Sequence, residues 1–259
     1  YFIHGQSNLW LIPINLIIIW LVSWLPKRRQ LLSKKSPAYF VFSAASLACY
    51  AYLYKLAGFL VNFLSQKWND KTLESLDQII FGFSPNLALA HFYRPWLSEL
   101  MMLAYLAYLP LVVWLAYELF RRTGPEEMQS YILTLGLAYL TCFIIFIIFP
   151  ASSPRFYFPN LPPRGGFLLE RLMRLVESRA QYQGGSFPSA HCAAGTVMIY
   201  FAFRVGMETF ILIAPMIVLF FISTVYGQYH YGVDVLGGMA IGIAAILIFN
   251  LIFKKKPAP

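Results

Sequence analysis

The sequence predicts an all-α protein, a polytopic transmembrane helix bundle of about six or seven spanning helices with interfacial amphipathic helices. Three observations support this fold class. First, 59% of the 259 residues are hydrophobic and only 12% are charged, whereas roughly a quarter of an average globular chain is charged. Second, long apolar stretches recur along the chain, and third, Lys and Arg stand in short clusters between them. This composition excludes a soluble globular enzyme, a disordered chain and a disulfide scaffold.

The predicted spanning helices follow from apolar stretches near the roughly 20 residues that a bilayer core about 30 Å thick requires. The candidate spans are Asn8–Leu25, Pro37–Leu64, Trp96–Phe120, Gln129–Phe149, Ser189–Gly206, Thr209–Tyr226 and Val233–Phe253. The first resembles a secretory signal, but it runs into a Lys-Arg-Arg cluster with no small-residue cleavage site. We therefore expect a retained helix there.

Two further segments are predicted to lie along the membrane interface. In Phe167–Gln181, leucines recur at helical spacing, and Glu170 and Arg174 are four residues apart on the other face. Asp70–Phe81 has a similar pattern of Leu and Ile residues. The simplest interpretation is that most residues of both helices only contact the membrane surface.

The formal net charge of +9 does not indicate nucleic acid binding, because the basic residues lie between apolar stretches, where they orient helices and meet lipid headgroups. One set of alternate connections holds eleven Lys and Arg residues and the other set holds eight. Five of those eight lie in one loop, Ala151–Pro188. We predict that the set of eleven is cytoplasmic and that this loop faces the outside.

Two of the four histidines stand where a loop enters a predicted span. His191 begins one helix and His230 begins the last, and both helices are entered from the outside in the predicted topology. The two imidazoles are therefore expected at the same depth, facing the Arg-rich loop. Asp234 follows His230 by four residues, so on a continuous helix its carboxylate can accept the imidazole N–H and fix the tautomer.

This combination of groups suits phosphoryl transfer. One imidazole can attack phosphorus and carry it covalently while a second protonates the departing oxygen. Guanidinium groups neutralise the phosphate oxygens. Ionisable groups at the edge of a span are costly unless they are paired or functional, and this cost favours a functional interpretation of the cluster.

Three motifs resemble those of the type 2 phosphatidic acid phosphatase superfamily. The Pro-Ser-Ala-His sequence that ends at His191 resembles its Pro-Ser-Gly-His motif, and Ser223, His230 and Asp234 match the spacing of a later motif. The Pro-Arg pair at Arg155 resembles the arginine portion of the first motif. The resemblance covers roughly residues 77 to 253, and it is nearest to a divergent branch of bacterial lipid phosphatases and inositol phosphorylceramide synthases.

The resemblance implies a role for each matching residue. His230 becomes the nucleophile that forms phosphohistidine, Asp234 orients it, and His191 protonates the leaving group. The implied phosphate-binding groups are Arg155, Ser189 and the backbone N–H of Ala190. The family works without a metal, so neither a metal nor another cofactor is expected.

The sequence departs from the family pattern at several positions. Ile148 stands where the first motif has lysine, Phe156 where it has proline, and Thr224 where the third motif has arginine. Ala190 replaces the glycine of the second motif. Two phosphate-binding cations are therefore missing. The candidate headgroup-binding residues in the long loop are Arg164, Arg171, Arg174 and Arg179.

The function that follows is a metal-independent lipid phosphatase. Residues 1–259 are treated as one membrane domain, in which 1–95 hold the N-terminal helices and an interfacial segment and 96–259 form the catalytic helix core. Its expected partner is a membrane lipid phosphate or diphosphate: phosphatidate, phosphatidylglycerol phosphate, a polyprenyl diphosphate or phosphorylated lipid A. The expected location is a bacterial inner membrane, with the site facing the periplasm or exterior.

Two alternatives stay open at this stage. A lipid phosphotransferase of the same fold would move the phosphoryl headgroup to an alcohol acceptor in place of water. A transporter, or a haem-bearing membrane protein that uses His191 and His230 as ligands, is an alternative of another class. A transporter is expected to place charges deep in several spans, and Lys55 is the main candidate for such a charge.

Overall fold

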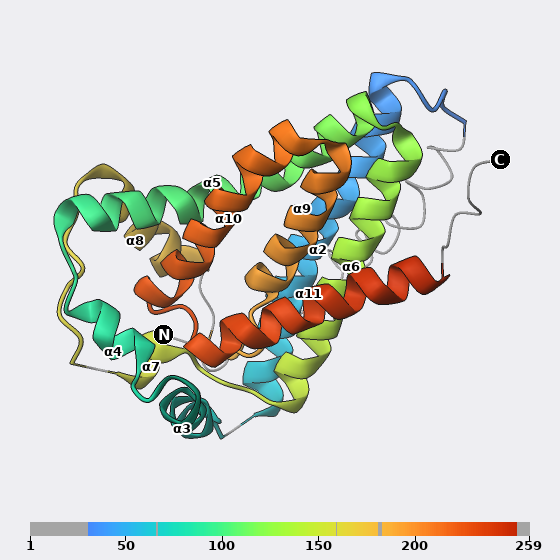
Figure 1. Cartoon of the computed structure of the whole chain (residues 1–259). Coiled ribbons are helices and arrows are strands. Elements are labelled where there is room, and N and C mark those ends of the chain that lie inside the picture. Colours follow the sequence, from blue (N-terminus) through green and yellow to red (C-terminus); the bar gives the residue numbers. More distant parts are fainter. Residues whose placement is uncertain (1–30, 66, 159, 181–182, 253–259) are drawn as a thin grey trace.

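The computed structural model describes residues 31–65, 67–158, 160–180 and 183–252. In these residues every regular element is a helix, which confirms the all-α prediction for this part of the chain. The predicted span Asn8–Leu25 lies outside the described residues. The helices, labelled in Figure 1, are α2 (Pro37–Leu64), α3 (Asp70–Phe81), α4 (Pro85–Ala90), α5 (Pro95–Arg122), α6 (Pro125–Ile148), α7 (Pro154–Tyr157), α8 (Leu168–Ala180), α9 (Ala190–Val205), α10 (Met207–Tyr226) and α11 (Gly232–Ile252).

Among the residues that the structure describes, five helices are long and apolar enough to cross a membrane: α2, α5, α6, α10 and α11. The predicted span Ser189–Gly206 corresponds to α9, which has only 16 residues. This helix contacts α5, α6, α10 and α11, and most of its residues are buried. A helix surrounded by protein does not have to match the thickness of the lipid. The described part of the chain therefore contains five long apolar helices around one shorter buried helix.

Local sequence signals set the helix boundaries. Proline occupies the first turn of α2, α4, α5, α6 and α7, where its missing N–H costs no intrahelical bond. Ser36 and Ser189 cap α2 and α9 by accepting hydrogen bonds from backbone N–H groups three residues later. Gly124, at φ 107°, joins α5 to α6 in a backbone conformation that favours glycine.

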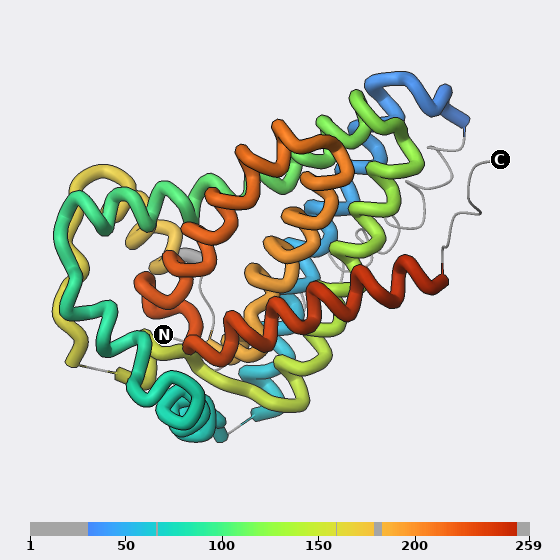
Figure 2. The backbone as a smooth tube through the Cα atoms, viewed as in Figure 1, coloured from blue at the N-terminus to red at the C-terminus, as the bar shows by residue number. Residues whose placement is uncertain are grey.

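The short connections arrange the bundle so that one end carries the long loops. The breaks at Gly124 and Gly206 join α5 to α6 and α9 to α10 at the opposite end. The end of α10 and the start of α11 therefore lie near the start of α9, with α3, α4 and α7 at the lower left of Figure 1 and α8 higher on the left side. In Figure 2 the yellow segment after α6, which includes α7 and α8, runs along the left side of the molecule beside α4 and the start of α5.

Two glycines of α11 allow it to lie against α9. A Cβ atom at Gly242 would lie 2.6 Å from the carbonyl oxygen of Ala193, and one at Gly238 would overlap the carbonyl oxygen of Ser189. The close approach also permits a main-chain hydrogen bond of 2.9 Å from Ser189 N–H to the Asp234 carbonyl. The starts of the two helices are therefore held together.

The two predicted interfacial helices are present, and both turn their acidic side chains toward the protein. The apolar Ile79 of α3 and Leu168 of α8 are 78% and 74% exposed. In contrast, Asp70 and Asp77 of α3 are buried, as is Glu177 of α8. These helices therefore do more than rest on a surface, because their buried carboxylates contact the loops that carry the histidines.

Candidate active site

His230 lies in the turn between α10 and α11, and its side chain is held in one tautomer. Its Nδ1 is 2.9 Å from the carbonyl oxygen of Ser186. A carbonyl oxygen can only accept, so Nδ1 carries the hydrogen and donates it. The other ring nitrogen, Nε2, then has a free lone pair. This is the form of imidazole that can attack an electrophile.

Asp234 supports this arrangement from a fully buried position. Its Oδ2 accepts hydrogen bonds from Ser186 Oγ at 2.5 Å and from Tyr231 N–H at 2.8 Å. The same oxygen lies 3.4 Å from His230 Nδ1. We expected the carboxylate to accept the imidazole N–H, but the Ser186 carbonyl does so. Asp234 instead fixes the Ser186 segment and brings a negative charge close to the ring.

His191, in the first turn of α9, faces His230 across a short gap. Their ring centroids are 5.8 Å apart. Aromatic rings surround His191, with centroids between 5.5 and 6.2 Å away: Tyr54, Tyr105, Tyr108 and Phe220. The structure thus brings together two histidines that are 39 positions apart in the sequence, at the same end of the bundle.

Both histidines line one cavity of about 660 Å³. Its walls come from α2, α5, α6 and α8, from the start of α9 and from the loops before α7, α9 and α11. Most of the lining side chains are apolar or aromatic. The only Lys, Arg, Asp or Glu among its described lining residues is Lys55 of α2. A space of this kind can hold an apolar chain beside a reactive polar end.

The N-terminus of α9 supplies hydrogen-bond donors to the cavity. Ala190 and His191 line it, and within the described residues no acceptor is bonded to their backbone N–H groups. Free N–H groups at a helix start attract anions. Ser189 is placed differently, because its Oγ accepts from Cys192 N–H at 3.2 Å and the residue does not line the cavity.

Ser152 and Ser153 also line the cavity, and we did not predict them as site residues. Their backbone N–H groups donate to the Asp70 carboxylate of α3 at 2.8 and 3.0 Å. Ser153 has φ 110°, a strained conformation for a residue with a side chain. The available sequence signal was the serine pair just before Pro154, within the segment that resembles the first family motif.

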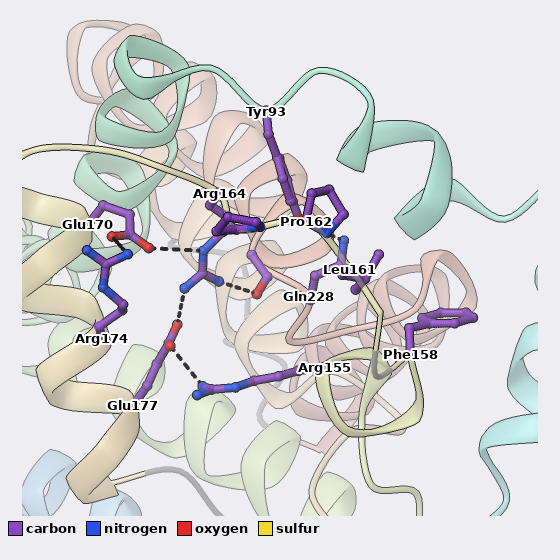
Figure 3. A pocket seen from close by; sticks show the side chains of 12 residues that line it. Tyr93, Arg155, Phe158, Leu161, Pro162, Arg164, Glu170, Arg174, Glu177 and Gln228 are labelled. Carbon is purple, nitrogen blue, oxygen red and sulfur yellow. Dashed lines mark hydrogen bonds and ion pairs between the residues drawn. The ribbon is translucent and has the colours of Figure 1, made fainter.

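Arg155, expected to bind phosphate, does not line the histidine cavity. Its guanidinium lies 2.9 Å from Glu177 of α8. It borders a second pocket of about 370 Å³, shown in Figure 3, where ion pairs link Arg155, Glu177, Arg164, Glu170 and Arg174 in a row. The carboxylates thus already neutralise part of the positive charge of this pocket.

Arg164 connects the long loop to the turn that carries His230. Its guanidinium donates to the Gly227 carbonyl at 2.6 Å and pairs with Glu177 at 2.7 Å. Burial alone would lower the pKa of Arg164, but Tyr229 and Glu177 hold that pKa above its ordinary value. The guanidinium therefore stays charged.

Tyr229 separates the second pocket from the histidine cavity. It lines the cavity, and its hydroxyl donates to Glu177 at 2.5 Å. Burial raises the pKa of Tyr229, so the hydroxyl keeps the proton that it donates.

The remaining arginines differ in their placement. Arg174 borders the second pocket, and Arg171 is exposed on α8. Arg179 falls in the last turn of α8, and its side chain lies outside the described part of the chain. Among the described residues, no group of three or more His, Cys, Asp or Glu side chains is placed to hold a metal ion.

Comparison with known proteins gives a family for this fold and site. The chain is 28% identical over 139 residues to a PA-phosphatase related-family protein of Dictyostelium discoideum, a match that covers 47% of this chain and 23% of that protein. The chain thus spans less than a quarter of the length of this relative. Its fold is similar to the crystal structure of a transmembrane PAP2 type phosphatidylglycerolphosphate phosphatase from Bacillus subtilis, with a TM-score of 0.53 and 19% identity.

That structural similarity covers 81% of this chain and 98% of the Bacillus chain. It agrees with the five long apolar helices in describing an integral membrane protein. A family model of the PAP2 superfamily matches residues 71–248, which include both histidines, Asp234, the long loop and all of α3 except Asp70. Because this match spans more than half of the sequence, the chain belongs to the PAP2 superfamily.

Proposed function

We propose that the chain is a lipid phosphatase that removes a phosphate from a membrane lipid phosphate or diphosphate through a phosphohistidine at residue 230. One observation carries this proposal. The bond from His230 Nδ1 to the Ser186 carbonyl leaves a lone pair on Nε2, and the ring lines the same cavity as His191. A nucleophile and a second proton-carrying group are therefore available to one bound phosphate.

The proposed reaction has two steps. In the first, the lone pair of His230 Nε2 attacks phosphorus, a P–N bond forms, and the bond from phosphorus to the lipid oxygen breaks. Protonated His191 gives its proton to that oxygen, so the lipid leaves as an alcohol, or as a monophosphate when the substrate is a diphosphate. In the second step water attacks phosphorus, neutral His191 takes a proton from the water, and the P–N bond breaks to release phosphate.

Fixed charges and dipoles favour both steps. Phosphorylated His230 is cationic while Nδ1 keeps its hydrogen, and the Asp234 carboxylate lies 3.4 Å from Nδ1. The free N–H groups of Ala190 and His191 can donate to the phosphate oxygens at the start of α9. These steps use protein groups alone, so we expect activity to survive EDTA.

The shape of the cavity supports a lipid as the substrate. On α2 it follows Ala44, Ala48, Ala51 and Lys55, which share one face of the helix at spacings of four, three and four residues. Across from them on α5, Leu109 also lines the cavity and is 66% exposed. We propose that an apolar chain enters from the membrane between α2 and α5 while the phosphate reaches the histidines.

For a substrate whose headgroup extends beyond the phosphorylated group, such as phosphorylated lipid A, we propose that the headgroup passes Tyr229 and reaches the second pocket. Arg164 and Arg174 border it, and Gln228 contributes a buried Oε1 without a hydrogen-bond partner among the described residues. Such an atom can accept from a hydroxyl of a glycerol or sugar headgroup. We propose that this end of the molecule faces the outside, as the basic residues between the spans predict, and that the membrane is a bacterial inner membrane.

The test is phosphate release by the detergent-purified protein from a panel of phosphatidate, phosphatidylglycerol phosphate, polyprenyl diphosphate and lipid A. The proposal predicts release that survives EDTA, falls with vanadate and is lost in His230→Ala. Glu208→Gln, a change of an 87% exposed side chain on α10, is the matched control and should retain activity. Phosphate release that persists in His230→Ala would contradict the proposal, and product that appears only with an added alcohol would favour a phosphotransferase.

A further inference from the structure

A cation within a membrane-spanning helix is costly unless it is paired or binds a ligand. Lys55 lies inside α2, nine residues before its end, and its side chain is exposed. No salt bridge or hydrogen bond connects its ammonium to another described residue. Its charge is therefore not accounted for by any partner in the described part of the protein.

The position of Lys55 relates this charge to the histidines. Its neighbour Tyr54 has its ring centroid 6.2 Å from that of His191. One residue of an α-helix rises about 1.5 Å, so the Lys55 backbone lies at nearly the same level of α2 as Tyr54, whose ring contacts His191. Lys55 also lines the cavity that the histidines share.

The cavity needs a positive charge if a phosphate is to enter it. A phosphate monoester carries close to two negative charges at neutral pH, and moving such an anion into a mostly apolar space is costly without a counter-charge. The arginines of the long loop whose side chains the structure describes do not line this cavity, and several of them are paired with Glu170 and Glu177. The lysine ammonium offers three donors and no acceptor, which suits a phosphate oxygen.

We propose that Lys55 binds the substrate phosphate at the membrane-facing side of the cavity and holds it against His191 and His230. The inference rests on the proposed function, because it assigns the cation that this site requires. It also gives α2 a part in the reaction, although α2 lies outside residues 71–248 that match the family model.

The test compares three variants of the full chain. Lys55→Met removes the charge and keeps an apolar side chain of similar length, and Lys55→Arg keeps the charge. Lys71→Met is the control, because Lys71 is an exposed lysine on α3 away from the cavity. For each protein we would measure kcat/KM on the lipid phosphate, inhibition by vanadate, and the rise in Tm caused by vanadate.

Losing a hydrogen bond to a charged group costs about tenfold to a hundredfold in binding. We expect Lys55→Met to lower kcat/KM and weaken vanadate inhibition by that factor, and to lose the vanadate-dependent rise in Tm. In Lys55→Arg, kcat/KM and vanadate inhibition should stay within about threefold of the wild type, a change well below the loss of a charged hydrogen bond. In Lys71→Met both quantities should be unchanged. If Lys55→Met does not fold, Lys55→Gln serves the same comparison.

Two results would overturn the inference. In one, vanadate binds Lys55→Met as tightly as it binds the wild type. In the other, kcat/KM falls while vanadate binding does not, which would mean that Lys55 contacts the lipid chain and not the phosphate. The Tm measurement does not depend on turnover. A wild type that binds vanadate through Lys55 but releases no phosphate would therefore uphold this inference while contradicting the proposed function.

Discussion

The hydrogen bond from His230 Nδ1 to the Ser186 carbonyl determines which ring nitrogen of His230 can react. The acceptor of this hydrogen bond is a backbone atom, so no substitution of the side chain at position 186 removes the acceptor directly. The Ser186 side chain is in turn bonded to Asp234. A single buried carboxylate thereby controls the acceptor of the imidazole hydrogen and the charge beside the ring.

Replacing Asp234 by asparagine tests the role of this carboxylate most directly. Asparagine keeps the size of the side chain but removes the negative charge that lies 3.4 Å from Nδ1. The proposed phosphohistidine then loses the counter-charge of its cationic ring, and we expect kcat to fall by about a hundredfold or more. KM should change little, because Asp234 does not line the cavity. Steady-state kinetics beside Glu208→Gln would check this, and an unchanged kcat in Asp234→Asn would contradict it.

At the scale of elements, α3 acts as a clamp on two loops of the site. Asp70 accepts the backbone N–H groups of Ser152 and Ser153 and the Tyr231 hydroxyl. Two helical turns further along α3, Asp77 accepts the N–H groups of Gly232 and Val233 at 2.9 and 2.7 Å. The start of α11, two residues after His230, is thus held by a helix whose apolar residues are exposed.

The clamp predicts a pH dependence of stability. Burial raises the pKa of Asp77 to about 6, although the two backbone hydrogen bonds oppose this. A carboxyl whose pKa is higher in the folded state binds a proton more tightly there than in the unfolded chain. Its contribution to stability is therefore largest below its ordinary pKa of 3.8 and is lost as the pH rises through about 6.

Thermal unfolding between pH 4 and pH 7 would measure this contribution. We expect the decline in Tm with rising pH to be shallower in Asp77→Asn, which cannot titrate, than in the wild type. Asp77→Asn should also lower activity, because an amide offers one acceptor oxygen where two N–H groups need acceptors. Thr72→Ala, at an exposed position of the same helix, is the control. Identical pH profiles of the wild type and Asp77→Asn would refute this role of Asp77.

At the scale of the whole molecule, the site depends on how closely α11 lies against α9. His191 begins one of these helices and Asp234 lies in the first turn of the other. Gly238 and Gly242 are the positions where the two backbones leave no room for a Cβ atom, and Gly238 is the nearer of the two to the site. The separation of the two helices therefore sets the geometry of the histidine pair.

Gly238→Ala should disturb the protein as a whole. The added methyl group would overlap the Ser189 carbonyl, and overpacking of this kind costs about 1–3 kcal/mol. We expect a lower Tm together with lower activity, because the start of α9 has to move. Ala244→Val adds bulk on an exposed face of α11 and should have little effect. Wild-type Tm and activity in Gly238→Ala would contradict the packing argument.

Much of this architecture was predictable from the sequence, because the helices are determined by local patterns. A long apolar stretch predicts α2, and an amphipathic pattern of Leu and Ile predicts α3, at the boundaries observed. The predicted boundaries of α9 differ by one residue at each end. The partners within the site depend on contacts between distant segments. Ser186 and His230 are 44 residues apart, and no local pattern indicates that a backbone carbonyl would accept the imidazole hydrogen.

The contacts of the charged residues were also harder to predict, because they too depend on segments that are distant in the sequence. A sequence shows that Arg155 follows a motif-like proline, but not that Glu177 on another helix pairs with its guanidinium. Lys55 is visible as a charge in an apolar stretch, but only the packing of α2 shows that it lines the same cavity as the histidines. The hydropathy pattern of α3 predicts an amphipathic helix, and its contacts show that the buried carboxylates hold loops of the site.

The central claim, that His230 carries the phosphoryl group, can be tested by trapping the intermediate. His191→Ala, supplied with an aryl phosphate whose leaving group needs no proton, should form phosphohistidine but hydrolyse it slowly for lack of a base. Peptide mass spectrometry after rapid quenching would locate the phosphate. We predict phosphate on His230 in His191→Ala, and none when His230→Ala is added. Turnover without a phosphorylated residue, or phosphate on another residue, would contradict the account.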